Sequence, residues 1–568
     1  MSDLEALAAE AYVYGFPLVF NLDEVERFTR KGMGSLAPTA FNRFSHAGTL
    51  AGPDDTFVSI NNDTVYSMAQ LDLSGGPLLL RVPDTGGRYY VFQFVDAWTN
   101  NFAYVGRRAT GTAAGAFLLT GPGWSGEVPA GTVRIASPTS VASIVGRWAC
   151  EGPDDLAAVR ALQQATALAP FGDRAASAGL PAPEAAVDGS DLLFFEKLRT
   201  RMRAFPPAGA DQDYQQRFAP LGLLESASPY SDPPAGLQQA LRAGHTAGKE
   251  RVEYATTHGS SPEQNGWKLA YDAFNYNLDF FGPGTLNTPQ WVFSDRATAR
   301  VVRAASARAG LWGNHGYEAA YAMTWNDGNG SPLDGTQAYT LRFQTTPPVD
   351  AFWSVTMYDL PDYYLVANPI NRYSAGDRTP GLHYEHDGSL TLHLQPDRPA
   401  DPAAAANWLP TPPGPFRPVL RMYQPRPAVF DGTYNLPPPS PAGTAPRRPP
   451  TTNVTVRASQ KAEPLGLGPR EPGREPPCAP QPAELLKGSL PCMLRGAPSR
   501  HASAVSLRPL RDGRLRLTPG GCAAGGEGRR DLASVRRGTA RHAIRCRSFR
   551  RSRGSSVKQP IRTNVQKG

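Results

Sequence analysis

Cysteine is scarce in this chain of 568 residues. Cys150 is the only cysteine within residues 1–440, and the other four lie beyond residue 440. A single cysteine cannot form an internal disulfide, and no Cys-x-x-Cys spacing is present for a structural zinc ion. We therefore expect hydrophobic burial to hold residues 1–440 together, with Cys150 as a small buried side chain. We expect neither a cofactor nor a metal ion.

Long apolar runs are missing as well. No segment approaches the roughly 18 apolar residues that cross a bilayer. The first residues, MSDLEALAAEAYVYGFPLVF, carry acids where a signal peptide carries basic residues, and their apolar residues have helical spacing. These features predict an N-terminal amphipathic helix, capped by Ser2 and Asp3 and interrupted at Gly15-Phe16-Pro17. They also predict a soluble, cytoplasmic protein without a membrane span.

Several enzyme signatures are absent from the sequence. It contains no G-x-S-x-G nucleophile elbow, no phosphate-binding P-loop, no H-E-x-x-H zinc motif and no dinucleotide-binding glycine fingerprint. These absences exclude the corresponding enzyme families and leave other enzymes open.

Charge divides the chain into two unlike parts. Residues 441–568 carry 26 Lys and Arg against 7 Asp and Glu, a net charge of +19. Residues 1–440 carry 32 and 43, a net charge of −11. Because a nucleic-acid groove needs clustered Lys and Arg, nucleic acid is not an expected partner of the acidic part.

The basic part, residues 441–568, is rich in Pro, Arg, Gly and Ser, and its only aromatic residue is Phe549. It has no apolar periodicity and cannot bury enough surface to offset chain entropy, so we expect it to be disordered. Two interpretations stay open: an Arg-rich arm that binds nucleic acid, and the translation of an unintended reading frame.

Short strands dominate the first third of the chain. Residues 78–82 and 89–95 are strand-like and flank the turn-rich Pro83-Asp84-Thr85-Gly86-Gly87, which is typical of a β-hairpin. Further strands are predicted at 117–119, 132–136 and 141–146. No helix-length connection separates them, so we expect them to be antiparallel, as in a β-sandwich.

A helical middle follows. Leu156, Val159 and Leu162 lie on one helical stripe, and the spacing of Trp267, Tyr271, Phe274 and Leu278 also predicts a helix. Residues 203–240, rich in Pro, Ala and Gly, are expected to form a loop or linker.

A second β region begins near residue 321. The segments AYTLRFQ, AFWSVTMYD, SLTLHLQ and VLRMYQP alternate like strands, and Asp387-Gly388 is a candidate hairpin turn. A jelly roll or a related sandwich would close these strands.

Two long stretches resemble known families. NNDTVYSMAQLDLSGGPLLLRVPDTGGRYYVFQFVDAWTNNFAYVGRRATG resembles the domain of unknown function 1254. YAMTWNDGNGSPLDGTQAYTLRF, NPINRYSAGDRTPGL, ANWLPTPPGPF and LRMYQPRPAVFDGTYNLPPP resemble its usual partner, the domain of unknown function 1214. Together they cover about residues 5–440. The resemblance implies an immunoglobulin-like β-sandwich, a helical middle and a C-terminal jelly roll. It implies no activity, and many relatives look exported.

The predicted fold is therefore mainly β with α. Its parts are an N-terminal helix (1–30), a β-sandwich (31–165), a helical or mixed segment (166–315), a jelly-roll-like domain (316–440) and a disordered basic tail (441–568).

Polar clusters next to predicted strands supply the candidate site residues. In the first, Asn61-Asn62-Asp63-Thr64-Val65-Tyr66, the Asn and Asp side chains either form Asx turns or present hydrogen-bonding groups to a ligand. The second, Asp96 to Asn101, follows the strand that ends at Val95. Its Trp98, Asn100 and Asn101 offer a ring face and amides that suit a sugar, or else plug the core.

A third cluster contains Asn371, Arg372, Tyr373, Asp377 and Arg378. Either Asp377 pairs with an Arg to pin a long loop, or an Arg receives an anionic substrate group. The residue types of His383, Glu385, His386 and His393 suit a zinc ion, but strand geometry would turn His383 and His386 to opposite faces, so no metal site is predicted.

Two functions remain open. The first is an enzyme, hydrolytic in one version, that acts on a polar small molecule or carbohydrate with Asp63 and Asp96 as general acid and base. The other is a non-catalytic, homo-oligomeric protein for ligand binding or assembly. The binding residues proposed for either function are Asn61, Asn62, Tyr66, Trp98, Asn100, Asn101, Arg372, Tyr373, Asp377 and Arg378.

Overall fold

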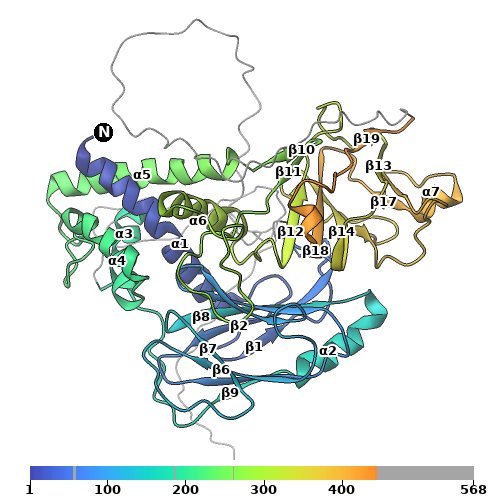
Figure 1. Ribbon diagram of the computed structural model, residues 1–568. Coiled ribbons are helices and arrows are strands. Elements are labelled where there is room, and N and C mark those ends of the chain that lie inside the picture. Colours follow the sequence, from blue (N-terminus) through green and yellow to red (C-terminus); the bar gives the residue numbers. More distant parts are fainter. Residues whose placement is uncertain (56–58, 185–186, 188, 260, 444–568) are drawn as a thin grey trace, which may run out of the picture. The chain divides into compact units, whose positions relative to one another are not determined.

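The strands between residues 44 and 170 form two sheets (Figure 1). The computed structural model describes residues 1–55, 59–184, 187, 189–259 and 261–443. A five-stranded sheet has the order β1-β2-β8-β4-β5 and a four-stranded sheet the order β7-β6-β3-β9. Their strands are β1 (Phe44–His46), β2 (Thr64–Asp72), β3 (Leu78–Val82), β4 (Tyr90–Asp96), β5 (Asn101–Gly106), β6 (Gly115–Thr120), β7 (Val133–Ala136), β8 (Val141–Ala149) and β9 (Ala167–Pro170).

Two more sheets form the later part of the fold. A six-stranded sheet has the order β10-β11-β12-β18-β14-β15, and a four-stranded sheet has the order β17-β16-β13-β19. Their strands are β10 (Glu263–Gln264), β11 (Trp267–Leu269), β12 (Ala319–Met323), β13 (Tyr339–Phe343), β14 (Val349–Asp359), β15 (Ser374–Gly376), β16 (Leu390–Gln395), β17 (Trp408–Pro410), β18 (Phe416–Pro425) and β19 (Ser440–Pro441). The structure is thus a mixed α and β fold with several sheets.

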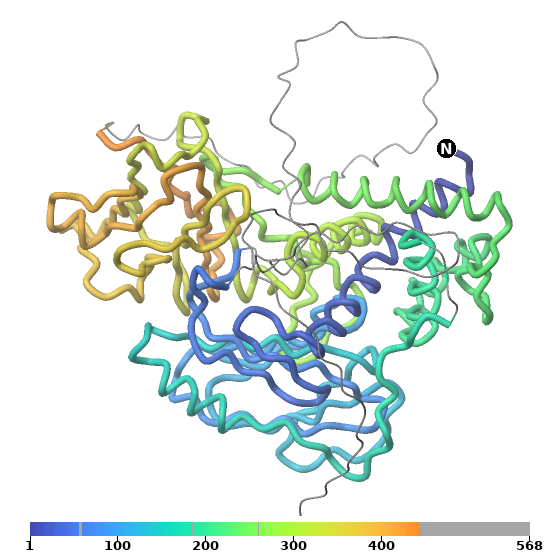
Figure 2. The backbone as a smooth tube through the Cα atoms, turned by 180° about the vertical axis from the view of Figure 1, so that it is seen from behind, coloured from blue at the N-terminus to red at the C-terminus, as the bar shows by residue number. Residues whose placement is uncertain are grey.

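The helices are α1 (Asp3–Lys31), α2 (Leu156–Ala165), α3 (Ser190–Ala204), α4 (Gly209–Gln215), α5 (Ala235–Thr257), α6 (Arg296–Gly310) and α7 (Pro402–Ala406). In Figures 1 and 2, α1 runs beside α5 and reaches down to the five-stranded sheet. It packs against α3, α5 and α6. Helix α4 and the start of α5 lie within residues 203–240, so the prediction of a loop there is wrong.

Helix α1 is continuous, which corrects the predicted interruption at Gly15-Phe16-Pro17. Ser2 caps it, with a capping box to Glu5. Pro17 is buried inside the helix, and a Cβ on Gly15 would lie 2.4 Å from Leu198 of α3. Tertiary packing on several sides thus overrides the helix-breaking preference of Pro17, and Gly15 allows α3 to come close.

The predicted hairpin of residues 78–95 is wrong. Strand β3 pairs with β6 and β9, whereas β4 pairs with β5 and β8 in the other sheet. The turn at 83–87 therefore carries the chain from one sheet to the other. Likewise, Asp387-Gly388 forms a turn before β16, but β16 pairs with β13 and β17. A turn signal marks a reversal of the chain and leaves the pairing partner open.

Two pairs of strands in the described part of the chain are parallel, contrary to the prediction of antiparallel strands throughout. They are β6 with β7 and β16 with β17. Residues 121–132 and 396–407 connect them, and each connection is about as long as a parallel crossover requires. A loop, or a loop with the short α7, replaces the helix that usually connects parallel strands.

The helix predicted from Trp267, Tyr271, Phe274 and Leu278 is absent. Trp267 begins β11, and the residues from 271 to 276 form turns. Asn265 and Gly266 both have positive φ, which reverses the chain directly before β11. The Trp267 side chain is fully buried and its Nε1 donates to Pro437 O at 2.8 Å. The helical spacing therefore reflects separate core contacts of a turning chain.

The five-stranded sheet is covered on both faces, because nearly every residue of β2, β4, β5 and β8 is buried. One hydrophobic cluster joins its residues to those of β3, β6 and α1. A charged side chain on such a sheet is therefore conspicuous.

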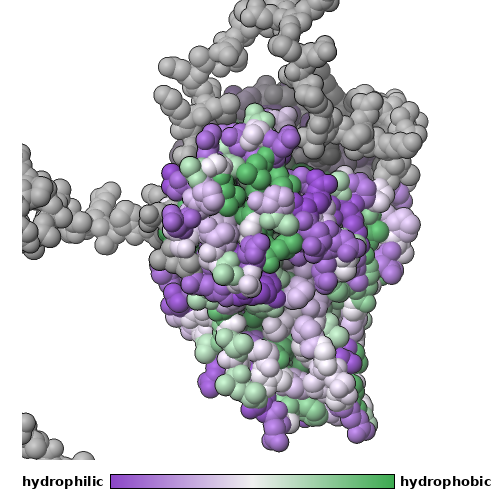
Figure 3. Space-filling model, turned by 90° about the vertical axis from the view of Figure 1, so that its left-hand side faces the viewer, coloured by the Kyte–Doolittle hydropathy of each residue, from purple (hydrophilic) through white to green (hydrophobic). Residues whose placement is uncertain are grey.

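The exposed surface is mixed. Figure 3 shows hydrophobic residues in green among hydrophilic ones in purple on the side that lies at the left in Figure 1. The exposed large hydrophobic residues, which include Val133, Leu224, Tyr254 and Ile370, are scattered along the sequence. The predicted homo-oligomer stays a prediction. Among the helices of the described residues, none is long and apolar enough to cross a membrane.

All described residues fall within one compact unit. The predicted boundaries between the parts of residues 1–440 stay predictions. The basic tail, apart from residues 441–443, lies outside the described residues, and so do both interpretations of it.

Candidate functional site

Asn61 organises the first polar cluster. Its Oδ1 accepts hydrogen bonds from Asp63 N (3.1 Å), Thr64 N (3.0 Å) and Thr64 Oγ1 (2.9 Å). This is an Asx turn, and it starts β2 at Thr64. Its Nδ2 donates to the hydroxyl of Tyr66. Asn62 Nδ2 donates to Ala51 O at 2.5 Å. The turn alternative thus describes Asn61 and Asn62, and it also fixes where Tyr66 lies.

Asp63 links the two halves of the fold. Its side chain is buried, and Oδ2 accepts hydrogen bonds from Ser354 Oγ (2.8 Å) and Tyr423 OH (3.1 Å) of the six-stranded sheet. Arg378 Nη2 donates to the backbone oxygen of Asp63 at 2.9 Å. The carboxylate therefore lies between the five-stranded and six-stranded sheets with neutral hydroxyl partners.

Asp63 and Asp96 lie at opposite ends of the five-stranded sheet. Cys150 N, directly after β8, donates to Asp63 O, whereas Asp96 pairs with Ala142 near the start of β8. Eight residues of extended strand separate these two points by roughly 27 Å. The two carboxyl groups cannot act on the same bond, so the pairing of Asp63 with Asp96 as acid and base is wrong.

The second polar cluster fits the core-plug alternative. Asp96 accepts from Asn100 N (2.8 Å) and Asn100 Nδ2 (2.9 Å), and Trp98 Nε1 donates to Phe205 O (2.8 Å). The Trp98 ring is 3% exposed and lies against Tyr14. A neighbouring cavity lined by Trp98 and Asn100 has about 10 Å³, room for about one water molecule.

Asp96 is fully buried, and it forms no ion pair with Lys, Arg or His among the described residues. Burial raises the pKa of Asp96 to about 6, and the hydrogen bonds from Asn100 and the charge of Arg303 offset only part of that effect. Asn101 is also engaged, since its Oδ1 accepts from Gln93 Nε2 (2.6 Å) and its Nδ2 donates to Gly313 O (3.0 Å).

The third cluster pins loops. Arg372 Nη1 donates to Ala406 O (2.8 Å) and Trp408 O (3.0 Å), and Tyr373 OH donates to Asn371 Oδ1 (3.1 Å). Asp377 Oδ1 accepts from Trp353 N at 3.0 Å rather than from Arg372 or Arg378. The Arg378 guanidinium lies over the Phe352 ring at 3.5 Å. Arg378 thus contacts the backbone of Asp63, whereas Arg372 contacts the backbone at Ala406 and Trp408.

His383, Glu385, His386 and His393 do not gather. Among the described residues, no group of three or more His, Cys, Asp and Glu side chains could hold a metal ion.

Sequence reasoning missed Arg147. It lies in β8 within VASIVGRWA, where every residue is buried, and it is 7% exposed. Arg147 is opposite Tyr66 of β2 in the antiparallel register, and its guanidinium lies 5.5 Å from the centre of the Tyr66 ring. A lone charge inside an apolar strand was the available signal.

Arg147 and Tyr66 line a cavity of about 70 Å³. It lies on the face of the five-stranded sheet toward the end of α6 and the turn after α1. Its other walls are Met33, Gly34, Ser35, Leu36, Ile60, Met68, Val145, Leu311 and Trp312. Because Gly34 and Ser35 are exposed, the cavity borders the surface there. Its volume would hold about five water-sized groups.

Neutral acceptors orient the Arg147 side chain. Nη1 donates to Gln93 Oε1 (2.9 Å) and Asn314 Oδ1 (3.4 Å), and Nη2 donates to Trp312 O (2.9 Å). Trp312 has a φ of 66°, a strained conformation for a bulky residue, and its Nε1 donates to Asn21 Oδ1 at 2.8 Å. These bonds hold both Arg147 and the Trp312 wall in place.

Further cations follow on the six-stranded sheet. Arg421 Nη1 donates to Thr356 Oγ1 (2.9 Å) and Nη2 to Ser59 O (2.7 Å). Arg417 is also buried, its Nη2 donates to Ser59 Oγ, and its Nε has no hydrogen-bond partner among the described residues. Burial lowers the pKa of Arg417 to about 10. The region between the sheets is therefore rich in buried positive charge.

His315 directly follows Asn314, an acceptor of Arg147, and it stays neutral. Burial and the charge of Arg108 lower the pKa of His315 to about 3. It therefore supplies no proton near neutral pH.

Comparisons with known proteins agree with this architecture. No curated protein matches the chain. The solved VPA0106 protein from Vibrio parahaemolyticus is 23% identical, covers 77% of this chain and 99% of its own, and has a TM-score of 0.59, which shows a shared fold. An uncharacterized protein from Burkholderia cenocepacia is 12% identical over 76% of this chain and 88% of its own, with a TM-score of only 0.35. The family described as protein of unknown function DUF1254 matches residues 41–170, and the one described as DUF1214 matches residues 318–427, so the predicted pair of domains is confirmed in its order.

Proposed function

We propose that this protein binds a small molecule in the cavity lined by Tyr66 and Arg147. The observation that carries the proposal is the presence of a charged and a phenolic side chain in the wall of an otherwise apolar cavity. Small-molecule sites combine apolar walls with a few placed polar groups in this way.

The position of the cavity also supports the proposal. Its floor is a rigid, doubly covered sheet, and its rim includes the exposed turn at Gly34 and Ser35. Tyr66 of the first polar cluster lines this site, and Asn61 donates a hydrogen bond to its hydroxyl. Trp98, Asn100, Arg372 and Tyr373 do not line it. A carbohydrate is a poor match for walls made mostly of Met, Leu, Ile, Val and Trp side chains.

A hydrolytic reaction stays a prediction. Asp63 is buried close to Tyr66 in the sequence, and it already accepts two hydroxyl hydrogen bonds. We therefore favour the binding alternative over catalysis by Asp63. We also infer that the two sheets that share a core with α1 are the layers of the predicted β-sandwich, and that β12 to β19 form the jelly-roll-like part.

Ligand-observed NMR on the full chain tests the binding function. The probes are neutral, acidic and basic fragments of up to about eight heavy atoms. Filling the cavity with Val145→Phe should abolish binding of every fragment that binds the wild type. Val133→Phe is the matched control, because Val133 is 46% exposed on β7.

Ser35→Trp is a milder variant that blocks the rim without changing the core, and it should weaken the same fragments. If no fragment binds, or if bound fragments are unaffected by both Val145→Phe and Ser35→Trp, the proposed site is wrong.

A further inference from the structure

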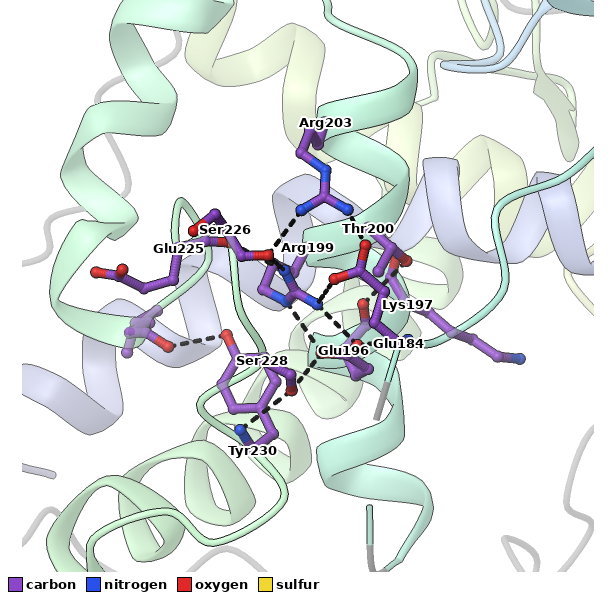
Figure 4. A network of polar contacts seen from close by, with 11 residues as sticks. Glu184, Glu196, Lys197, Arg199, Thr200, Arg203, Glu225, Ser226, Ser228 and Tyr230 are labelled. Carbon is purple, nitrogen blue, oxygen red and sulfur yellow. Dashed lines mark hydrogen bonds and ion pairs between the residues drawn. The ribbon is translucent and has the colours of Figure 1, made fainter. Parts of the chain in front are cut away.

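Buried arginines in this fold differ in how their charge is compensated. Arg199 of α3 is 1% exposed, and Figure 4 shows it enclosed by acceptors. Two carboxylates bind it, Glu184 at 2.7 Å and Glu196 at 2.9 Å, and the backbone oxygens of Glu225 and Ser226 accept from its Nη1. This is the full compensation that a buried guanidinium normally requires.

Arg147 forms no ion pair among the described residues. Its fixed partners, Gln93, Asn314 and the Trp312 backbone, are all neutral. Burial lowers the pKa of Arg147, whereas Tyr66, Tyr321 and Tyr423 raise it, and the net result is a pKa above the usual value. Since arginine cannot lose its proton in a protein, the charge persists in the buried site.

Among the described residues, Asp63 forms no ion pair with Arg147. It acts on Arg421, whose pKa is held above its usual value against the effect of burial by Tyr358, Tyr423 and Asp63. The carboxylate also accepts from Ser354 and Tyr423. Arg147, Arg417 and Arg421 are all buried, and Arg147 lines the cavity of about 70 Å³.

We propose that the ligand of this cavity is a short-chain carboxylate, and that Arg147 binds its anionic group. This inference rests on the binding function proposed for the same cavity. Arg147 donates to Gln93 and Asn314 through Nη1 and to Trp312 O through Nη2. The guanidinium has five N–H groups, so Nε and the second N–H of Nη2 can donate to carboxylate oxygens. The ring of Tyr66 lies beside that position.

The walls define the other end of the ligand. Met68, Val145 and Leu311 would contact an alkyl chain, and the volume of about 70 Å³ admits about five non-hydrogen groups. An unsubstituted acid of about four carbons, which has six non-hydrogen atoms, supplies both ends and lies at the upper limit of this volume. Inorganic phosphate would leave the apolar walls unused, and an amine would be repelled by the arginine.

Titration calorimetry on the full chain tests the inference with three probes of equal length: butanoate, butanamide and butan-1-amine. A hydrogen bond to a charged group contributes about 1.5–3 kcal/mol, so butanoate should bind about ten- to a hundredfold more tightly than butanamide. Each added methylene should increase affinity roughly fourfold until the cavity is full.

Variants of Arg147 separate charge from packing. Arg147→Met should weaken butanoate at least tenfold and leave butanamide nearly unchanged, and Arg147→Lys should restore part of the butanoate affinity. Arg426→Met is the matched control. Arg426 is exposed, it pairs with Asp350, and neither residue lines the cavity.

The outcomes distinguish the two proposals. Butanamide that binds as tightly as butanoate, or butanoate that binds Arg147→Met as tightly as the wild type, overturns the carboxylate inference while Val145→Phe can still confirm the cavity. If no fragment binds the wild type, both proposals fail.

Discussion

Two buried arginines in this chain, Arg199 and Arg147, differ in the charge of their hydrogen-bond partners. Arg199 stands among Glu184, Glu196 and two backbone oxygens in the helical part, whereas Arg147 stands among neutral groups at a cavity of the five-stranded sheet. Both are almost fully buried. A buried charge in an ion pair stabilises the fold. A buried charge without an ion pair can instead be stabilised by a bound anion.

The largest effect is expected when the compensated network is broken. Arg199→Met leaves the Glu196 carboxylate, which is fully buried, without its guanidinium. The free energy of unfolding should fall by about 3–5 kcal/mol. Chemical denaturation of the full chain measures it, and the double variant Arg199→Met/Glu196→Leu should recover much of the loss. A single variant as stable as the wild type would show that this network is not structural.

Asp96 extends the comparison to a buried acid without an ion pair. Unlike arginine, this carboxyl group can become neutral by binding a proton. Because its pKa is raised to about 6, the native state binds more protons than the unfolded state between about pH 4 and pH 6. Stability should therefore fall as pH rises through this window, by about 3 kcal/mol from this group alone.

Asp96→Asn should remove that fall. Denaturation of wild type and variant at a series of pH values from 4 to 7 gives the difference between the two stability curves. The prediction fails if the two curves stay parallel.

Removing the uncompensated arginine should matter much less to stability. Arg147→Met loses hydrogen bonds to neutral acceptors and also removes a buried charge, so the free energy of unfolding should change by less than about 2 kcal/mol. Thermal denaturation without ligand measures this change. A loss as large as that of Arg199→Met would mean that Arg147 serves the fold rather than a ligand.

The smallest effect is expected at the surface. Arg426 and Asp350 form an ion pair in which the side chains are 57% and 63% exposed. Arg426→Ala should change stability by less than about 0.5 kcal/mol, and the change should vanish in high salt. A larger change would undermine the use of Arg426→Met as a control.

The sequence predicts local structure well where local preferences decide it. Strand-like segments locate β13, β14, β16 and β18, although only β13 and β16 alternate between buried and less buried residues. The Asx turn at Asn61 follows from its residue types. The quoted motifs also identify the two families in the correct order.

Long-range partners decide the rest. The turn at 83–87 is correctly read, but only the whole fold determines that β3 and β4 join different sheets. Pro17 stays helical because α1 is packed on several sides. Asp63 meets Ser354 and Tyr423, and these contacts span nearly 300 residues or more of sequence, so no local pattern reveals them. Arg147 carried a readable signal, a lone charge in an apolar strand.

The most direct test of the central claim is the butanoate dissociation constant of Arg147→Met relative to that of the wild type, measured by calorimetry on folded full-length protein. The account predicts at least tenfold weaker binding of butanoate and nearly unchanged binding of butanamide. Equal butanoate affinities in the two proteins would contradict it.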